Sequence, residues 1–165
     1  MDKATEIKQV CTELLLVPFE GYHTKLANGS CTAYPDPGPN GLPVTIGYGS
    51  TYNEDGSLIQ LGDVWTHEHS VYMKSIELNK ALGALMVYSP KLFNEPASRI
   101  AAVLSWIYNC GIGNYRVSTF KKKIDACEWE DAAEQCKKWD KAKGKVLRGL
   151  TRRRAAEANL IINPI

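Results

Sequence analysis

Two acidic residues and a threonine in the first third of the sequence are the residues best suited to carry out chemistry. Glu20 follows an apolar segment, Asp36 lies in a Tyr-Pro-Asp-Pro-Gly turn, and Thr45 precedes Ile-Gly-Tyr-Gly. Two carboxyl groups can hydrolyse a glycosidic bond when one protonates the leaving oxygen and the other, ionised, activates water. The two groups need different environments for these roles. Glu20 is therefore the better candidate for the acid, and Asp36 for the ionised partner.

An amphipathic helix is predicted directly before Glu20. Apolar residues recur at helical spacing from Ile7 to Leu15, which favours a helix over residues 5–17. Pro18 is expected to end that helix, because proline cannot continue the hydrogen-bond ladder. Glu20 should then lie just beyond a helix end.

Residues 20–62 are rich in glycine and proline and are predicted to form a small antiparallel β lobe. Three short β-prone pieces lie at residues 32–34, 44–46 and 57–59. An Asp-Gly pair before the third piece is a typical hairpin turn. Asp36 and Thr45 fall within this lobe.

Residues 63–165 return to a helical pattern. Thr66 can cap one helix, Pro96 lies in the first turn of a second, and Gly111 ends it. Shorter helices are expected at residues 118–126, 129–139 and 151–162. The sequence thus predicts an α+β fold in a single domain, residues 1–165. It would consist of the β lobe, a larger helical lobe that includes helix 5–17, and a cleft between them.

Several motifs, taken in their order along the chain, indicate a protein family more specifically than the pair of carboxyl groups does. They are Glu20-Gly21, Ala-Tyr-Pro-Asp-Pro-Gly at 33–38, Thr-Ile-Gly-Tyr-Gly at 45–49, the helical segment 101–111, and the segments 129–133 and 149–157. In this order they resemble the phage-type lysozymes, the endolysins of glycoside hydrolase family 24. The resemblance covers the chain from about Val10 to Ile162 and implies a phage-lysozyme-like fold.

The resemblance also implies an activity. It suggests a muramidase that hydrolyses the β-1,4 bond between N-acetylmuramic acid and N-acetylglucosamine in peptidoglycan, with inversion, and so lyses the host cell. Glu20 would be the general acid, Asp36 would position and activate the attacking water, and Thr45 would help to hold that water.

Supporting residues follow from the same resemblance. An arginine of the last helix would pair with the acid; Arg154 matches best and Arg153 less well. No cofactor is implied, and a monomer is expected. The residues expected to line the sugar cleft are Tyr48, Gly49, Tyr108 and Asn109.

The composition excludes several other classes of protein. Apolar residues make up 44% of the chain and charged residues 23%, which is typical of a globular domain and excludes a disordered chain. No apolar run approaches the ~18–20 residues of a membrane span, and the first residues lack the pattern of a signal peptide. The chain is therefore expected to stay in the host cytoplasm, without a membrane anchor, until it reaches the cell wall. By resemblance, a holin would supply that release.

Charged and metal-binding residues give further expectations. Residues 121–154 carry 12 Lys or Arg against 6 Asp or Glu, a balance of +6 that favours an anionic partner. The bacterial wall is the expected partner, since no nucleic-acid recognition motif accompanies the charges.

The five cysteines have no metal or disulfide spacing, so reduced thiols are expected. His67 and His69 would point to different faces of a helix, which is poor geometry for a metal.

Other functions stay open at this point. A lytic transglycosylase would cleave the same bond with the glutamate alone, and the presence of Asp36 and Thr45 argues against it. A non-catalytic peptidoglycan-binding domain would need none of the three residues. A basic protein that acts on nucleic acid is the least favoured interpretation.

Overall fold

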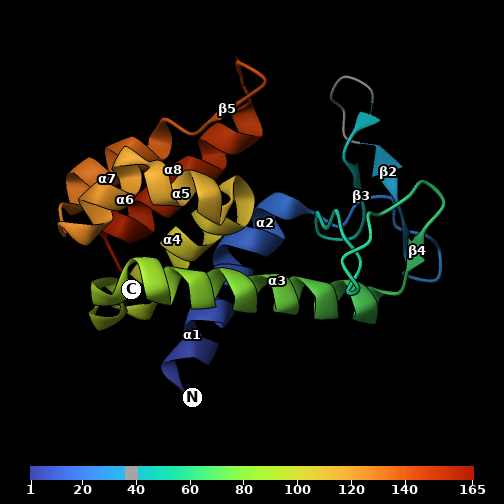
Figure 1. Ribbon diagram of the computed structural model, residues 1–165, viewed down its shortest axis with the longest axis horizontal. Helices are drawn as coiled ribbons and strands as arrows, with labels where there is room; N and C mark the ends of the chain where they lie inside the picture. Colours follow the sequence, from blue (N-terminus) through green and yellow to red (C-terminus); the bar gives the residue numbers. More distant parts are fainter. Residues whose placement is uncertain (36–40) are drawn as a thin grey trace. The chain divides into compact units, whose positions relative to one another are not determined.

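The computed structural model describes residues 1–35 and 41–165. The chain forms two compact units (Figure 1): the first comprises Met1–Phe19 with Leu78–Ile165, and the second comprises Glu20–Glu77. Helices make up most of the first unit, and the second contains two small antiparallel sheets. The predicted α+β fold is confirmed.

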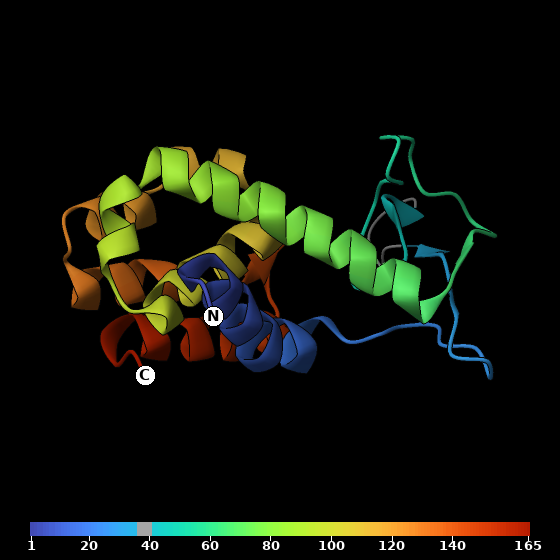
Figure 2. The ribbon, with the colours of Figure 1, turned by 90° about the horizontal axis from the view of Figure 1, so that it is seen from below.

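Helix α3 (His67–Tyr88) belongs to both units and is uninterrupted (Figure 2). Thr66 caps it as predicted, because its Oγ1 accepts a hydrogen bond of 3.1 Å from the His69 N–H. The first half of the helix contributes Met73 to the core of the second unit. That unit therefore extends to Glu77, well beyond the end of the glycine-rich segment.

The N-terminal helical segment is longer than predicted. It consists of α1 (Lys3–Val10), a π-helical stretch η1 (Cys11–Leu16) and α2 (Val17–Glu20). The prediction that Pro18 ends the helix is wrong. The helical segment continues through Pro18 to Glu20, and the stretch that precedes it is π-helical, with the Val17 N–H bonded to the Thr12 carbonyl oxygen.

Helix α4 (Ala97–Cys110) is the central element of the first unit. Every residue from Ala97 to Ile107 is buried, as expected for a helix that is largely apolar on all sides. Gly111 ends it with a φ of 85°, as predicted. The other helices of this unit are η3 (Pro90–Asn94), α5 (Ile112–Val117), α6 (Thr119–Asp125), α7 (Trp129–Lys137) and α8 (Arg148–Ile162).

The tryptophan side chains mostly pack in cores. Trp106 of α4 is fully buried and lies 4.8 Å, ring centre to ring centre, from Trp139. Trp65 is buried in the separate core of the second unit. The guanidinium of Arg99 lies 4.2 Å from the ring centre of Trp129. Packing therefore explains these residues without a sugar-stacking role.

A short hairpin between α7 and α8 was not predicted. Strands β5 (Lys141–Ala142) and β6 (Lys145–Val146) pair in antiparallel register through a two-residue turn. The turn residues Lys143 and Gly144 have φ of 52° and 76°, and positive φ at both positions is typical of tight hairpins. Lysine is not a usual residue in that turn, so this segment carries no recognisable hairpin signal.

The second unit contains two two-stranded sheets. Strand β1 (Cys31–Thr32) pairs with β4 (Val64–Trp65), and β2 (Tyr34–Pro35) pairs with β3 (Val44–Thr45), both antiparallel. The predicted Asp-Gly hairpin turn is confirmed, since the residues that flank it, Tyr52 and Leu58, form an antiparallel bridge. A small core of Cys31, Ile46, Ile59, Trp65 and Met73 holds this unit together.

Candidate active site

Glu20 is the last residue of α2, and its side chain is half-buried. Gly21 follows with a φ of 66°, a conformation that glycine adopts at little cost, so the chain turns directly after the acid. Gly49 lies close by: a Cβ atom on Gly49 would be 3.4 Å from Oε2 of Glu20. The absence of a side chain at Gly49 therefore leaves space beside the carboxyl group.

The segment that contains Gly49 is a tight turn. Ile46 and Ser50 exchange two backbone hydrogen bonds of 3.0 Å each and enclose the three residues between them. Gly47 has a φ of 62°, and a Cβ atom there would be 3.0 Å from Ser70 Oγ. Glycines at positive φ on both sides of Tyr48 reverse the chain, so Tyr48 and Gly49 lie in a turn that follows strand β3.

Thr45 lies on strand β3, opposite Tyr34 of β2. Its side chain is largely buried, and its Oγ1 lies 3.4 Å from the Pro43 carbonyl oxygen, a long hydrogen bond. Asp36, the expected partner of Glu20, lies outside the described residues. The role of Thr45 therefore stays a prediction, as does that of Asp36.

Tyr48 is surrounded by three side chains of the second unit. Its hydroxyl lies 3.2 Å from Nε2 of His67, and its ring centre lies 5.2 Å from that of Tyr22. The Nζ of Lys74, a largely buried lysine, lies 4.3 Å from the centre of the Tyr48 ring, a cation–π contact. His67 and Lys74 are seven residues apart on α3 and so lie on one face of it. Sequence reasoning missed Lys74 and the role of His67 in this contact.

The two phenols of this cluster hold their protons more tightly than free tyrosine does. Burial raises the pKa of Tyr22 to about 12, and the nearby Cys31 thiol adds to the effect. Burial also raises the pKa of Tyr48. Both hydroxyls are therefore neutral hydrogen-bonding groups at ordinary pH.

Asn109 and Arg154 are in contact within the first unit. Asn109 is exposed at the end of α4, and its Oδ1 accepts a hydrogen bond of 2.9 Å from Nη2 of Arg154. Arg154 of α8 is fully buried, and its Nη1 lies 3.0 Å from Sγ of Cys110. The half-buried Tyr108 precedes Asn109 on the same helix. The structure thus joins Arg154 to a residue that was predicted to contact the sugar.

Glu157 completes this network and was missed by sequence reasoning. Its fully buried carboxylate lies 3.0 Å from Arg154 Nε and 3.2 Å from Arg153 Nε, and it accepts a 2.6 Å hydrogen bond from Ser105. Burial raises the pKa of Glu157, while the guanidiniums of Arg154 and Arg153 oppose that rise. The helical spacing of the two arginines and the glutamate was the signal that could have revealed the network.

The burial of Arg153 and Arg154 corrects the prediction for the basic segment. Both were counted among the charges facing a partner, but their guanidiniums are inside the first unit. Three lysines of the segment are also paired with carboxylates: Lys121 with Asp125, Lys123 with Glu128 and Asp131, and Lys137 with Glu134. A count of charges along the sequence cannot tell which side chains point inward.

An open pocket of about 400 Å³ lies within the first unit beside Asn109. Asn114 and Trp139 also line it, together with Lys141 and Leu147 of the hairpin segment. The pocket therefore offers amides, an aromatic ring and a cation next to a predicted sugar-contacting residue.

No metal site is found in residues 1–35 and 41–165, where no three His, Cys, Asp or Glu side chains are grouped to hold an ion. His67 contacts Tyr48, and the ring of His69 lies 4.6 Å from that of Trp65, so the two histidines have separate neighbours.

Helices long and apolar enough to cross a bilayer are absent from the part of the chain that the structure describes. The five cysteines, all of them described, carry thiols and not disulfides.

Comparison with solved structures defines the class of protein. The endolysin from Escherichia coli O157:H7 phage FAHEc1 has a similar fold, with a TM-score of 0.71 and 25% identity, over 100% of this chain and 96% of that one. The chain therefore has the fold of the phage endolysins, as its sequence predicts. Residues 19–157 match the family model for phage lysozyme, so the chain belongs to the phage lysozyme family.

Individual relatives agree with this assignment. An endolysin of Acyrthosiphon pisum secondary endosymbiont phage 1 is 33% identical over 122 residues, 70% of this chain and 77% of that protein. A SAR-endolysin of bacteriophage PS119 is 36% identical over 67 residues, 41% of this chain and 40% of that protein. The matches span 40%, 25% and 41% of the first three curated relatives.

Proposed function

We propose that this protein is a peptidoglycan-degrading muramidase, an endolysin that hydrolyses the β-1,4 bond between N-acetylmuramic acid and N-acetylglucosamine. Membership of the phage lysozyme family supports this proposal. The observation that carries it is the half-buried carboxyl of Glu20 at a helix end, with the bare backbone of Gly49 beside it. An acid that must reach a sugar oxygen needs such an unobstructed side.

In the proposed reaction, Glu20 donates its proton to the glycosidic oxygen as the bond to the anomeric carbon breaks. A water molecule attacks that carbon from the opposite face, and Asp36 takes the proton that the water loses. Attack from the opposite face inverts the configuration at the anomeric carbon. Thr45 would hold the water, since a hydroxyl can both donate and accept a hydrogen bond.

The remaining residues would bind and orient the glycan. Tyr48 and Gly49 supply a ring and a close backbone approach next to Glu20, and Tyr108 and Asn109 supply a ring and an amide at the end of α4. Arg154 would support the site by holding Asn109 through their 2.9 Å hydrogen bond. Its pairing with the acid stays a prediction.

Clearing of purified peptidoglycan by the Glu20→Gln variant tests the proposal. Loss of the general acid should slow clearing by roughly 10²–10⁴-fold. The matched control is Glu68→Gln, which removes an exposed carboxylate of the same unit and should clear normally. Clearing by Glu20→Gln at the rate of the control would exclude Glu20 as the acid.

Two rival functions give different results in the same assay. A lytic transglycosylase leaves anhydro-muramic ends, which mass spectrometry of the digest detects, and Asp36→Asn would leave its rate unchanged. A non-catalytic binding domain would sediment with peptidoglycan and never clear it. Hydrolytic ends, together with a loss in Asp36→Asn, support the muramidase.

The biological setting is part of the same proposal. The protein would act as a monomer on the cell wall, and a holin would release it from the host cytoplasm. Expression in bacteria with and without a holin tests this setting: lysis should require the holin. Proton NMR of the first product formed would report the anomer, and hence whether the reaction inverts.

A further inference from the structure

Two segments of the second unit meet at the proposed acid. One is the chain directly after Glu20, which ends α2 and is followed two positions later by Tyr22. The other is the tight turn of residues 46–50, in which a Cβ atom on Gly49 would lie 3.4 Å from Oε2 of Glu20. The relative position of these two segments therefore determines the surroundings of the acid.

His67 contacts both segments. Its ring lies 5.3 Å, centre to centre, from the ring of Tyr22, and the two rings meet edge to face at 81°. Its Nε2 lies 3.2 Å from the hydroxyl of Tyr48, the residue before Gly49 in the turn. A phenol hydroxyl can both donate and accept a hydrogen bond, so this contact can form with either tautomer of the imidazole. One side chain thus joins the two segments beside the acid.

The face of α3 that carries His67 also supports the turn through other residues. The Nζ of Lys74 lies 4.3 Å from the centre of the Tyr48 ring, and a Cβ atom on Gly47 would come within 3.0 Å of Ser70 Oγ. Positions 67, 70 and 74 have the spacing of one helix face. Ser70 and Lys74 are buried, whereas His67 is exposed. His67 can therefore be replaced without opening the core of the unit.

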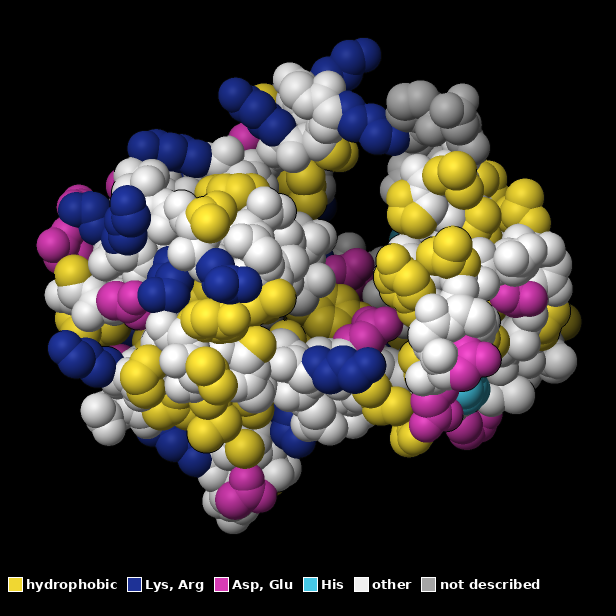
Figure 3. Space-filling view, viewed as in Figure 1, with side chains coloured by type: hydrophobic (Ala, Val, Ile, Leu, Met, Phe, Trp, Pro, Cys, Tyr) yellow, Lys and Arg dark blue, Asp and Glu magenta, His cyan; other side chains and the backbone are white. Residues whose placement is uncertain are grey.

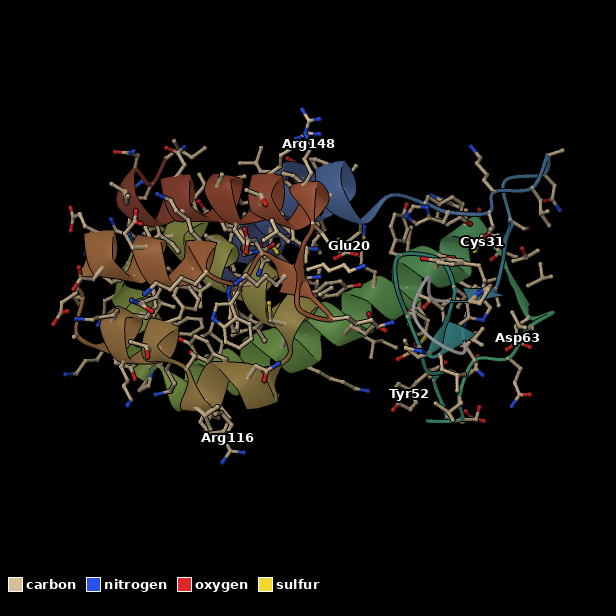
Figure 4. The ribbon with its side chains drawn as sticks, turned by 90° about the horizontal axis from the view of Figure 1, so that it is seen from above. Glu20, Cys31, Tyr52, Asp63, Arg116 and Arg148 are labelled. Carbon is tan, nitrogen blue, oxygen red and sulfur yellow. The ribbon has the colours of Figure 1, made fainter. Side chains whose placement is uncertain are left out.

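Tyr48 differs from a tyrosine that only covers the surface. Hydrophobic and acidic side chains share the surface of the second unit (Figure 3), and Tyr52, which is 53% exposed, lies at its edge (Figure 4). Tyr48 is half-buried instead. Tyr22 and Lys74 lie against its ring, and His67 contacts its hydroxyl. The surrounding side chains therefore set the orientation of Tyr48 and of the turn that carries it.

We propose that His67 is a positioning residue for the muramidase reaction. Through the Tyr48 hydroxyl it holds the turn in the place that leaves the backbone of Gly49 beside the Glu20 carboxyl. His67 acts through Tyr48 and does not itself contact the reacting atoms. This role rests on the proposed function, in which Glu20 is the acid, and adds to it a side chain outside the residues expected to bind or cleave the glycan.

A small displacement of the turn is enough to slow the proposed reaction. A general acid must come within about 2.6–3.2 Å of the oxygen that it protonates, and a misplacement of about 1 Å can cost roughly a hundredfold in rate. Without His67 the Tyr48 hydroxyl loses this contact, so the ring and its backbone can shift. The space beside Glu20 then changes with them.

Clearing of purified peptidoglycan at saturating amounts tests the proposal. His67→Ala should slow clearing roughly tenfold. His67→Gln should stay within about threefold of the wild type, because the glutamine amide reaches about as far as Nε2 and can bond the phenol. Both variants should keep the urea midpoint of the wild type, since His67 is exposed. Wild-type clearing by His67→Ala, or equal losses in the two variants, would overturn the proposal.

The matched control for these variants is the neighbouring histidine. The ring of His69 lies 4.6 Å from that of Trp65, and His69→Ala should clear peptidoglycan normally. A loss in His69→Ala equal to that in His67→Ala would contradict a specific role for His67.

A double-mutant cycle shows whether His67 acts through the Tyr48 hydroxyl. Tyr48→Phe should slow clearing about as much as His67→Ala, and the double variant should lose no more than either, because both changes remove the same contact. Losses that multiply to roughly a hundredfold would mean independent effects and would contradict the proposal. Tyr52→Phe removes an exposed hydroxyl of the same unit and should clear normally.

NMR of the full chain with isotope-labelled histidine detects the contact independently of activity. Tyr48→Phe should shift the Nε2 resonance of His67 and leave that of His69 in place. An unchanged His67 resonance would exclude the contact. A wild-type protein that does not clear peptidoglycan would contradict the proposed function, whereas equal clearing by the wild type and His67→Ala would contradict only the role of His67.

Discussion

Gly49 and Glu20 approach so closely that a Cβ atom on Gly49 would lie 3.4 Å from Oε2 of the glutamate. Gly49 also has a φ of 99°, a conformation that other residues rarely adopt. The glycine therefore serves two purposes: it allows the tight turn after Ile46, and it leaves space beside the proposed acid. Substitutions can separate these two purposes.

Gly49→Ala should reduce both stability and activity. A side chain at positive φ costs about 1–2 kcal/mol of unfolding free energy. The new methyl group would also lie against the Glu20 carboxyl, 3.4 Å from its Oε2, and fill space that a sugar needs to reach the acid, which should slow clearing by roughly tenfold or more. The matched control is Gly56→Ala, because Gly56 has a φ of 85° and open space around its missing Cβ. The control should lose similar stability and keep its activity; equal activity losses would mean that the strain alone explains both.

Arg154→Ala should strongly destabilise the first unit. The change removes a positive charge that compensates the buried Glu157 carboxylate, and it removes the hydrogen bond to Asn109. The free energy of unfolding should therefore fall by ~3–5 kcal/mol. Arg152→Ala, two positions earlier on the same helix, removes an exposed guanidinium and should change stability by less than ~0.5 kcal/mol. Urea unfolding measures both. Similar midpoints for the two variants would contradict the buried network.

Tyr22 should make the protein less stable at high pH. Its pKa is raised to about 12 in the folded protein from an ordinary value of 10.0, so the folded state binds this proton more tightly. The resulting stabilisation is complete below pH 10 and is lost as the pH rises from 10 towards 12. Tyr22→Phe should therefore show a shallower fall in unfolding free energy over this range. Tyr52→Phe, at an exposed tyrosine, is the control and should keep the wild-type slope.

Thiol labelling should distinguish the cysteines by burial. Cys127 is exposed and should react first in the native protein. Burial raises the pKa of Cys110 and of Cys136, and the reactive species is the thiolate, so these two should react slowly. Cys127→Ser should abolish the fast phase. All five thiols should react after unfolding without reductant, and a smaller number would reveal a disulfide.

The sequence alone determined the features that depend on neighbouring residues. The cap at Thr66, the helix end at Gly111 and the Asp-Gly hairpin turn each follow from backbone preferences of a few adjacent residues, and each is confirmed. Ordered motifs also indicated the family, which the family model confirms over residues 19–157. Local signals of this kind do not require knowledge of what lies across the fold.

Only the tertiary structure decided which residues come together from distant parts of the chain. Strand β4 has two residues and was not predicted, because its pairing with Cys31 and Thr32 depends on a partner far away in the sequence. The sequence marked Arg154 as a charged residue of a basic segment, but packing of α8 against α4 buries it beside Glu157. The closeness of Gly49 to Glu20 has the same origin. Burial and proximity are properties of the packed chain, since the free energy of a charge or a missing side chain depends on what surrounds it.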